Sequence, residues 1–438
     1  MSKETARSGF DRLGVMSGGE FAIAVIGGAT AGAEAADIFA KKGVLVVVFE
    51  QNTRPYGKVE DGLPRWHVGL RAKEYATIDQ KLGQPNVHFV PSTKVGRDVS
   101  LRELANDWGF HSVVLANGAW RDRPLPVPDA EKWVGRGLVY QNPFIQWFNH
   151  RHESAYRGPV FEALDDTLVV GGGLASIDVV KAVNLELASD ALRAKGAHVD
   201  LEELEVEGIP KALAAAGLSW EGLGRKGATL YYRRRVEDMP LVSLPDGANE
   251  KVVAKIEKTR AHMLEKAVGK YLFNVRPLRA PVALLVENER VVGMRFAITR
   301  MEGGKLVQTA ETEEARGAQV ISSIGSIPEP IEGVPQKGEL YAYSDWDLGR
   351  LPDFPTLFSA GNVVTGKGNI VDSRKHARHV GQHVRDEYLK LVDGLAALPP
   401  LTGAQRESLL GRVKARQDKV GFRDYAKWIQ AARPPEFI

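Results

Sequence analysis

The sequence predicts an α/β protein that contains two similar parallel-sheet domains of three layers each. The prediction starts from two glycine turns, at 27–32 and 171–173, in a chain of 438 residues. Each turn follows an apolar run rich in β-branched residues and precedes an alanine-containing stretch with helical spacing. A strand, a glycine turn and a helix in this order open a Rossmann-like dinucleotide-binding domain. Two such units in one chain therefore predict two Rossmann-like domains.

The first unit has the features of an FAD or NAD site. Its strands are expected at 21–26 and 44–49. Glu50 lies 23 residues after Gly27, near the roughly 20-residue offset of the acidic residue that binds the adenosine ribose. A carboxylate here would repel a 2′-phosphate, so the site favours FAD or NAD over NADP. Ala29 replaces the second glycine of the motif, and a chance glycine turn before a helix is the alternative interpretation.

The second unit carries the opposite charge at the equivalent position. A strand at 167–170 leads into the second glycine turn, and the next strand, 228–232, ends at Arg233, Arg234 and Arg235. Guanidinium groups at the end of this second strand can accept the 2′-phosphate of NADP. The second nucleotide is therefore predicted to be NADP(H), and a solvated basic strand end is the alternative.

The remaining segments contain further expected elements. The other expected strands are 86–90, 112–116, 284–288, 290–299, 319–324 and 354–360. Residues 121–143 are rich in proline and are expected to be an irregular crossover. In the aromatic stretch that follows, Trp147 and Phe148 are expected to pack in a core. A helix is expected from Asn369 to about residue 391, and the charged C-terminal helices are expected to decorate the surface.

Composition excludes several functional classes. The formal net charge of +3 gives no indication of a nucleic-acid or membrane partner. No apolar run approaches the roughly 20 residues that span a bilayer. Residues 1–20 lack the apolar stretch of a signal peptide, so a cytoplasmic location is expected. The absence of cysteine excludes a disulfide, a redox-active dithiol and an iron–sulfur cluster held by thiolates of this chain. No metal site is predicted.

The motifs resemble those of a known superfamily over residues 21–384. The chain resembles the two-dinucleotide-binding-domain flavoproteins, in particular the adrenodoxin-reductase-like ferredoxin–NADP reductases, and also the small-subunit flavin module of glutamate synthase. Besides the two glycine turns, the likeness rests on Tyr232-Arg233-Arg234 followed by Met239-Pro240. It also rests on Ala360-Gly361-Asn362, where Asn replaces the usual Asp.

The resemblance implies an NADPH-binding domain inserted in a split FAD-binding domain. The expected division is a polar lead-in at 1–20, FAD-binding parts at 21–142 and 335–390, an NADPH-binding domain at 143–334 with a helical insertion at about 184–226, and a C-terminal helical extension at 391–438.

The resemblance also implies which residues bind the cofactors. Toward FAD they are Gly27, Ala29, Gly32, Glu50, Gly57, His67, Gly118, Gly361, Asn362, Gly368, Asn369 and Ile370. Toward NADPH they are Gly171, Gly173, Leu174, Ala175, Ser176, Arg233 and Arg234. Catalytic roles are implied for His67, beside the flavin, and for Glu250, near the nicotinamide. A loop histidine with a structural role only is the alternative for His67.

Together these features predict an NADPH-dependent FAD oxidoreductase. Electrons would pass from NADPH through the flavin to a small iron–sulfur protein such as ferredoxin. One alternative is a flavin electron-transfer subunit of a larger glutamate-synthase-like or oxygenase complex. An alternative of another class is an FAD- and NADP-binding sensor or structural protein without turnover. Dithiol chemistry of the thioredoxin-reductase type is excluded because cysteine is absent.

Overall fold

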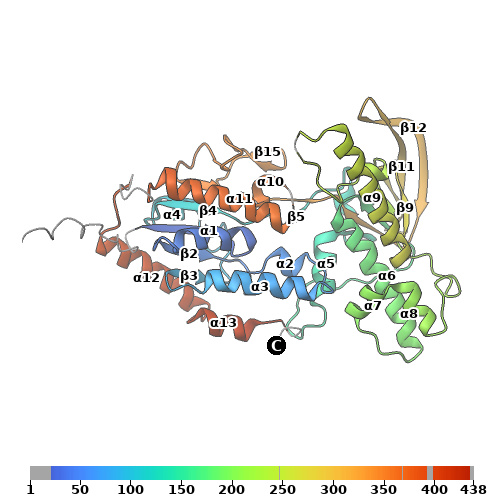
Figure 1. Cartoon of the computed structure of the whole chain (residues 1–438), viewed down its shortest axis with the longest axis horizontal. Coiled ribbons are helices and arrows are strands. Elements are labelled where there is room, and N and C mark those ends of the chain that lie inside the picture. The colour runs from blue at the N-terminus through green and yellow to red at the C-terminus, as the bar shows by residue number, and fades with distance from the viewer. Residues whose placement is uncertain (1–20, 246, 367, 392–397, 435–438) are drawn as a thin grey trace, which may run out of the picture. The chain divides into compact units, whose positions relative to one another are not determined.

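The computed structural model in Figure 1 describes residues 21–245, 247–366, 368–391 and 398–434. The expected lead-in at 1–20 lies outside the described residues. The chain forms two compact units. Unit 1 comprises the chain through Gly57, Lys73–Ala119 and the chain from Pro328 onward, and unit 2 comprises Lys58–Ala72 and Trp120–Ile327. Among the described residues, no helix is both long and apolar enough to cross a membrane.

Unit 1 is built on a parallel sheet with the strand order β17-β4-β1-β2-β3. Its strands are β1 (Ala22–Ile26), β2 (Leu45–Phe49), β3 (Val87–Val90), β4 (Ser112–Leu115) and β17 (Leu357–Ser359), with a hairpin of β15 (Gln336–Lys337) and β16 (Leu340–Tyr341). Its helices are α1 (Thr30–Ala40), most of α3 (Val68–Leu82), α4 (Leu101–Asn106), α10 (Asn362–Thr365), α11 (Ile370–His383), the π-helical turn η3 (Val384–Tyr388), α12 (Gly403–Lys419) and α13 (Tyr425–Ala432).

The strand order of unit 1 reverses at β1. Strands β2 and β3 follow on one side of β1, and β4 pairs on its other side. Open α/β sheets bind ligands beside the carboxyl end of the strand where the order reverses. Strands β1 and β2 are buried along their whole length, as expected for parallel strands that are covered on both faces.

Unit 2 contains a parallel sheet in the order β6-β13-β7-β8-β9, in which β13-β7-β8-β9 corresponds to β4-β1-β2-β3 of unit 1. Its parallel strands are β6 (Leu138–Tyr140), β7 (Thr167–Gly171), β8 (Thr229–Tyr231), β9 (Asn274–Arg276) and β13 (Gln319–Ser323). Its helices are α2 (Lys58–Asp61), the start of α3, α5 (Gln141–His150), α6 (Leu174–Ala194), α7 (Leu201–Glu207), α8 (Ile209–Ala215) and α9 (Glu250–Tyr271), with the 3-10 turns η1 (Ala130–Trp133) and η2 (Val236–Asp238). The order reverses at β7. The α/β class with two Rossmann-like domains is thus confirmed.

One layer of unit 2 is a second sheet, which is antiparallel. It consists of β10 (Arg279–Glu287), β11 (Arg290–Glu302) and β12 (Lys305–Arg316). Phe296 of β11 stacks on Tyr231 of β8, with ring centroids 4.3 Å apart, and both belong to one buried cluster. The expected strands 284–288 and 290–299 are therefore too short, and β12 was not predicted. Its many charged residues are mostly exposed, which removes the apolar signal of a buried strand.

The proline-rich segment 121–143 is more regular than expected. It contains β5 (Arg121–Asp122), which pairs with β14 (Ser326–Ile327), as well as η1 and the edge strand β6. It packs within unit 2, as do residues 58–72, whereas both were expected in the first FAD-binding part. The stretch after it forms α5, where Trp147 and Phe148 are buried in the core of unit 2.

The C-terminal extension contributes to the core of unit 1. Leu409 and Val413 of α12 are fully buried in the same cluster as β1, β2 and β4 residues. Figure 1 shows α12 and α13, in red, alongside β3 and α3 of unit 1. The expectation of helices was right, but their role is not surface decoration. Helix α11 also ends earlier than expected, at His383, and η3 follows it.

Substitution of Gly32 tests the contact that holds α1 against β1. A Cβ on Gly32 would lie 1.8 Å from the carbonyl oxygen of Gly27, which no rotamer can relieve. We expect Gly32→Ala to reduce the free energy of unfolding by about 3 kcal/mol or more and therefore to lower the melting temperature strongly. The control is Gly411→Ala in α12, because a Cβ on Gly411 would meet nothing within 4 Å. This substitution should stabilise the helix by about 0.5–1 kcal/mol. Equal melting temperatures for the two variants would contradict this close approach.

Candidate functional site

The first glycine turn is shaped by backbone contacts that leave no room for side chains. Gly27 has φ +99°, and a Cβ on it would lie 2.6 Å from the carbonyl oxygen of Ala116 at the end of β4. Helix α1 begins after Ala29, whose side chain makes no capping hydrogen bond, and its first turn contains no acidic residue. The first N–H groups of α1 are therefore suited to an anion.

Glu50 is fixed against this turn. Its Oε2 accepts a hydrogen bond of 2.8 Å from the N–H of Gly28, and its Oε1 accepts one of 2.8 Å from the N–H of Asn52. The residue is only 3% exposed. The carboxylate that the sequence assigns to a ribose is thus held beside the glycine turn at the carboxyl end of β2.

A third glycine turn, after β17, meets the first. Gly361 has φ +81°, and a Cβ on it would lie 2.6 Å from the Cβ of Ala31 in α1. Among the described residues, the buried amide oxygens of Asn362 and Asn117 have no hydrogen-bond partner. Asn117 immediately precedes Gly118, which has φ +68°. Two unpaired buried acceptors close to a backbone cradle fit a ligand that carries hydroxyl groups.

His376 of α11 holds the third turn and was not found from the sequence. Its Nδ1 accepts a hydrogen bond of 3.0 Å from the N–H of Gly361. Its Nε2 lies 3.1 Å from the carbonyl oxygen of Asp347. These two bonds require a neutral imidazole with the proton on Nε2. Burial lowers the pKa of His376, which favours this neutral form.

Helix α11 begins where the sequence predicted. The Asn369 side chain caps it by accepting a hydrogen bond of 2.7 Å from the N–H of Asp372. Gly368 and Asn369 are exposed, and Ile370 is half-buried. An exposed helix N-terminus presents the positive end of the helix dipole to its surroundings.

The second glycine turn, in unit 2, combines two close contacts with one open position. A Cβ on Gly171 would lie 2.3 Å from the carbonyl oxygen of Ser323, and a Cβ on Gly172 would lie 2.2 Å from the ring of Tyr232. A Cβ on Gly173 would meet nothing within 4 Å. Helix α6 starts after Gly173 with no side-chain cap and no acidic residue in its first turn.

The first residues of α6 leave this position accessible. Leu174 and Ala175 are exposed, whereas Ser176 is buried and donates a hydrogen bond of 2.7 Å to the carbonyl oxygen of Gly173. Backbone N–H groups and an open glycine at a helix N-terminus are the features that receive a phosphate.

The three arginines after β8 differ in their partners. Arg235 donates hydrogen bonds of 3.0 and 2.8 Å to Asp238 and also lies 3.4 Å from Glu257. Within the described chain, no ion pair holds the side chains of Arg233 or Arg234. The structure therefore distinguishes one arginine with an internal role from two that remain able to bind an anion.

His67 lies in unit 2, at the turn before α3, beside the buried Trp66. The ammonium group of Lys181 in α6 lies 4.7 Å from the Trp66 ring centre and 4.5 Å from that of Tyr271. Lys181 also pairs with Glu205 at 2.7 Å. This buried group attaches the His67 loop to α6. Burial, together with the charge of Lys181, lowers the pKa of His67.

Glu250 and Gly57 occupy simpler positions. Glu250 is exposed in the first turn of α9, after the capping residue Asn249. No described hydrogen bond joins its side chain to the second glycine turn. Gly57, the last residue of unit 1 before α2, has φ +52° and follows the buried Tyr56.

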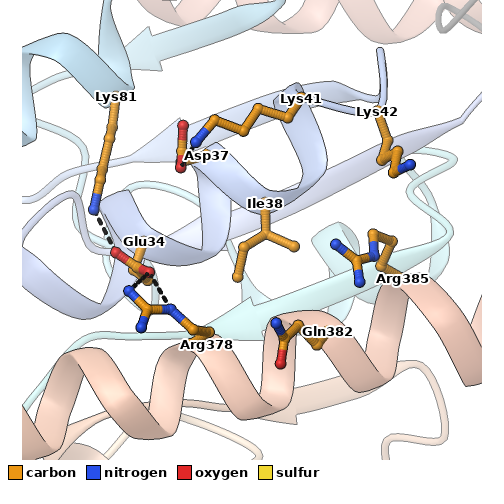
Figure 2. A pocket seen from close by; sticks show the side chains of 9 residues that line it. All are labelled: Glu34, Asp37, Ile38, Lys41, Lys42, Lys81, Arg378, Gln382 and Arg385. Carbon is orange, nitrogen blue, oxygen red and sulfur yellow. Dashed lines mark hydrogen bonds and ion pairs between the residues drawn. The ribbon is translucent and has the colours of Figure 1, made fainter.

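A pocket of about 360 Å³ between α1 and α11 lies away from the glycine turns (Figure 2). It is lined by Glu34, Asp37, Ile38, Lys41, Lys42, Lys81, Arg378, Gln382 and Arg385. Burial opposes the charge of Glu34, but hydrogen bonds from Lys81 and Arg378 lower its pKa. These ion pairs clamp α1 to its neighbours, so the pocket is assigned a structural role.

A second charged cluster surrounds His150 in unit 2. Its Nε2 lies 2.8 Å from Asp61 and its Nδ1 lies 2.5 Å from Glu153. Despite burial, these carboxylates raise the pKa of His150 to about 9. Glu60, His150 and Glu153 have the spacing of metal ligands, but the imidazolium already supplies a positive charge between the carboxylates.

Comparison with known proteins places this geometry in a family context. No protein-family model matches the chain. Cindoxin reductase of Citrobacter braakii is 32% identical over 164 residues, which cover 37% of this chain but only 34% of that protein. The mitochondrial NADPH:adrenodoxin oxidoreductase of Salvelinus fontinalis is 24% identical over 399 residues, which cover 80% of this chain and 74% of that protein.

Among solved structures, FprA of Mycobacterium tuberculosis in complex with NADPH has a TM-score of 0.68 at 19% identity, over 91% of each chain. This likeness concerns the fold, and the adrenodoxin reductase match extends over the same two units. The chain is therefore similar in sequence to an NADPH:adrenodoxin oxidoreductase and shares its fold with FprA. The flavoprotein resemblance predicted from the sequence is thereby confirmed.

Most of the predicted site residues lie at two places in the structure. In unit 1, Gly27, Glu50 and Gly361 belong to turns that touch one another through Ala31 and Gly28. In unit 2, the predicted residues surround the start of α6 and the end of β8. His67 belongs to unit 2 as well, and Glu250 stands apart on α9. Sequence reasoning missed Lys181 and His376, and also the contact of Tyr232 with Gly172, because these roles depend on packing between distant segments. The predicted residues near the start of α6 and the end of β8 are Gly171, Gly173, Ser176, Arg233 and Arg234.

The hydrogen bond between His376 and Gly361 predicts that the stability of unit 1 depends on pH. The unfolded imidazole titrates near 6.5 and the folded one lower, so the unfolded state binds the proton first. Stability is therefore lost as the pH falls below 6.5 toward the folded pKa. We expect His376→Gln, which keeps an acceptor but does not titrate, to lose less stability than the native chain between about pH 7 and pH 5.

Urea unfolding across this pH range measures the effect. The charged groups that face His376 are Asp347 and His379, and both stay in place in the variant. Equal losses of stability in the two proteins would contradict the role of His376.

Proposed function

We propose that this protein is an NADPH-dependent FAD oxidoreductase that passes electrons through flavin to a small iron–sulfur protein such as ferredoxin. One observation carries the proposal. Four strands have the same order in the two sheets, β4-β1-β2-β3 and β13-β7-β8-β9. Glu50 follows β2, whereas Arg233 and Arg234 follow the corresponding strand β8. A carboxylate suits a ribose without a 2′-phosphate, and guanidinium groups suit a ribose that carries one.

In unit 1, the residues fit FAD. The first N–H groups of α1 would receive the pyrophosphate between Gly27 and Gly32, and Glu50 would accept hydrogen bonds from the ribose hydroxyls. The unpaired amide oxygen of Asn362 would accept a hydrogen bond from a hydroxyl group of the ribityl chain. The methyl group of Ala29 would restrict how closely the pyrophosphate approaches the backbone, but it makes no hydrogen bond to the N-terminus of α1.

Other residues of unit 1 would complete the FAD site. Gly57 and Gly118 allow the backbone to turn with positive φ beside the first glycine turn. The N-terminus of α11, with Gly368, Asn369 and Ile370, would stabilise negative charge on the reduced flavin ring through its dipole.

In unit 2, the residues fit NADPH. Gly171 and Gly173 shape the turn, and the N–H groups of Leu174, Ala175 and Ser176 would bind the pyrophosphate. Arg233 and Arg234 would bind the 2′-phosphate by charge-assisted hydrogen bonds. The proposed NADPH site thus consists of Gly171, Gly173, Leu174, Ala175, Ser176, Arg233 and Arg234.

When bound, the two cofactors would supply the redox chemistry, which is hydride transfer from NADPH to flavin followed by release of single electrons. The protein orients the rings and controls protons. His67, kept neutral by its lowered pKa, has one donor and one acceptor nitrogen for this task. Glu250 is proposed to act near the nicotinamide. The sequence contains no cysteine and so supplies no thiolate-ligated redox centre for these electrons, and the acceptor in the proposed reaction lies outside it.

Anaerobic reduction tests the proposal directly. The purified protein should carry bound FAD, and NADPH should bleach the flavin absorbance much faster than NADH. Flavin that stays oxidised with NADPH would refute the proposal. Reduction of cytochrome c that depends on added ferredoxin supports an independent reductase. Reduction only after a subunit is added supports the alternative of a flavin subunit in a larger complex.

The arginines after β8 provide a test of nucleotide choice. We expect Arg233→Gln and Arg234→Gln each to raise KM for NADPH about tenfold or more, through loss of contacts worth roughly 1.5–3 kcal/mol. KM for NADH should not change, since NADH lacks the 2′-phosphate. The matched control is Arg235→Gln, because that guanidinium is already bound to Asp238. Steady-state kinetics with both nucleotides would disprove the assignment if all three variants behaved alike.

A further inference from the structure

The C-terminal helices α12 and α13 pack along the free edge of the unit 1 sheet. Strand β3 is the last strand in the order of that sheet. The side chain of Gln417 donates a hydrogen bond of 2.9 Å to the carbonyl oxygen of Phe89 in β3. Phe422 and Tyr425 lie edge-on to the Phe89 ring, with centroids 5.9 and 5.2 Å away. The extension is therefore docked by directional contacts as well as by its buried apolar residues.

From this position α13 reaches the loop that follows Glu50. The indole N–H of Trp428 donates a hydrogen bond of 2.8 Å to the carbonyl oxygen of Thr53. The guanidinium group of Arg54 donates one of 3.0 Å to the carbonyl oxygen of Ala432. Two successive loop residues are thus bonded to one short helix, one through its backbone and one through its side chain.

A third connection runs through Asp79 of α3. Its carboxylate accepts a hydrogen bond of 2.9 Å from the hydroxyl of Tyr425 and one of 3.2 Å from the hydroxyl of Tyr56. Tyr56 is 1% exposed and stacks on Tyr75 at a centroid distance of 3.8 Å. Helix α13 therefore also holds the far end of the same loop.

The inner side of this loop touches the first glycine turn. A Cβ placed on Gly28 would lie 2.8 Å from the Cβ of Pro55. The same Gly28 donates its N–H to Glu50. Residues 52–56 thus lie between α13 on one side and, on the other, the turn and carboxylate that would bind the adenosine half of FAD.

We propose that α12 and α13 form a clamp that positions the 52–56 loop and thereby sets the affinity of unit 1 for the adenosine half of FAD. The inference rests on the proposed function, because it takes Glu50 and the first glycine turn as the FAD adenosine site. It assigns a specific role to the C-terminal extension. Trp428 and Tyr425 are positioning residues in this clamp, since they act on the site only through the loop.

The test compares FAD with FMN, which lacks the adenosine monophosphate half. In the variant Trp428→Phe/Tyr425→Phe, an aromatic ring stays at both positions, but the hydrogen bonds to Thr53 and Asp79 are lost. Loss of these two hydrogen bonds should raise the dissociation constant for FAD about tenfold. The dissociation constant for FMN should stay unchanged. Titration of apoprotein, followed by quenching of flavin fluorescence, measures both constants.

Matched controls separate the clamp from general loss of stability. Tyr388→Phe also removes a single tyrosine hydrogen bond in unit 1, to the carbonyl oxygen of His111, far from the loop in sequence. Lys427→Ala changes an exposed residue of α13 itself. Both should bind FAD like the native protein. A chain that ends at residue 420 removes α13 but keeps Leu409 and Val413, and it should lose FAD affinity at least as much as the double variant.

The outcomes are distinct. Suppose that the native protein binds FAD and that both the folded double variant and the shortened chain bind FAD equally well. The proposed clamp is then wrong, while the proposed function stands. Equal weakening of FAD and FMN also overturns the clamp, because the effect would then not concern adenosine. Failure of the native apoprotein to bind FAD refutes the proposed function itself.

Discussion

The close approach of backbone at the first glycine turn is the constraint on which unit 1 depends. Helix α1 passes so near the end of β1 that a single methyl on Gly32 would overlap the carbonyl oxygen of Gly27. This approach aims the first N–H groups of α1 at the place where the strand order reverses. Gly361 then packs against Ala31 of the same helix. Two segments distant in sequence, the turn at 27–32 and the turn at Gly361, thus meet because Gly32 and Gly361 have no side chain.

Unit 2 uses the same arrangement with different supports. An antiparallel sheet covers one face of its parallel sheet, and the ring of Tyr232 lies where a side chain on Gly172 would be. The charge after the second strand is reversed, and pairing with Asp238 reserves Arg235 for the protein itself. In the proposed function, selection between the two nucleotides would depend on a few side chains in two similar domains. Because only a few side chains differ, the same type of domain can bind either of the two proposed cofactors.

Supporting residues outside the motifs give the candidate sites their rigidity. His376 fixes the third turn through a neutral imidazole, and Lys181 holds the His67 loop to α6 between two aromatic rings. The C-terminal helices brace the loop after Glu50. In each case a residue from a distant segment bonds to a loop that carries a motif. Loops that bind ligands require such support because their own backbone makes few regular hydrogen bonds.

The sequence by itself determined the fold class, both glycine turns and the opposite charges at Glu50 and Arg233, because these depend on local periodicity and fixed spacing. Only the tertiary structure decided that 58–72 and 120–142 pack in unit 2 and that β12 extends a second sheet. It also decided that the C-terminal helices are core elements. A polar helix or a charged strand acquires its role from the partner that covers it, and such long-range contacts leave no periodic signal in the chain.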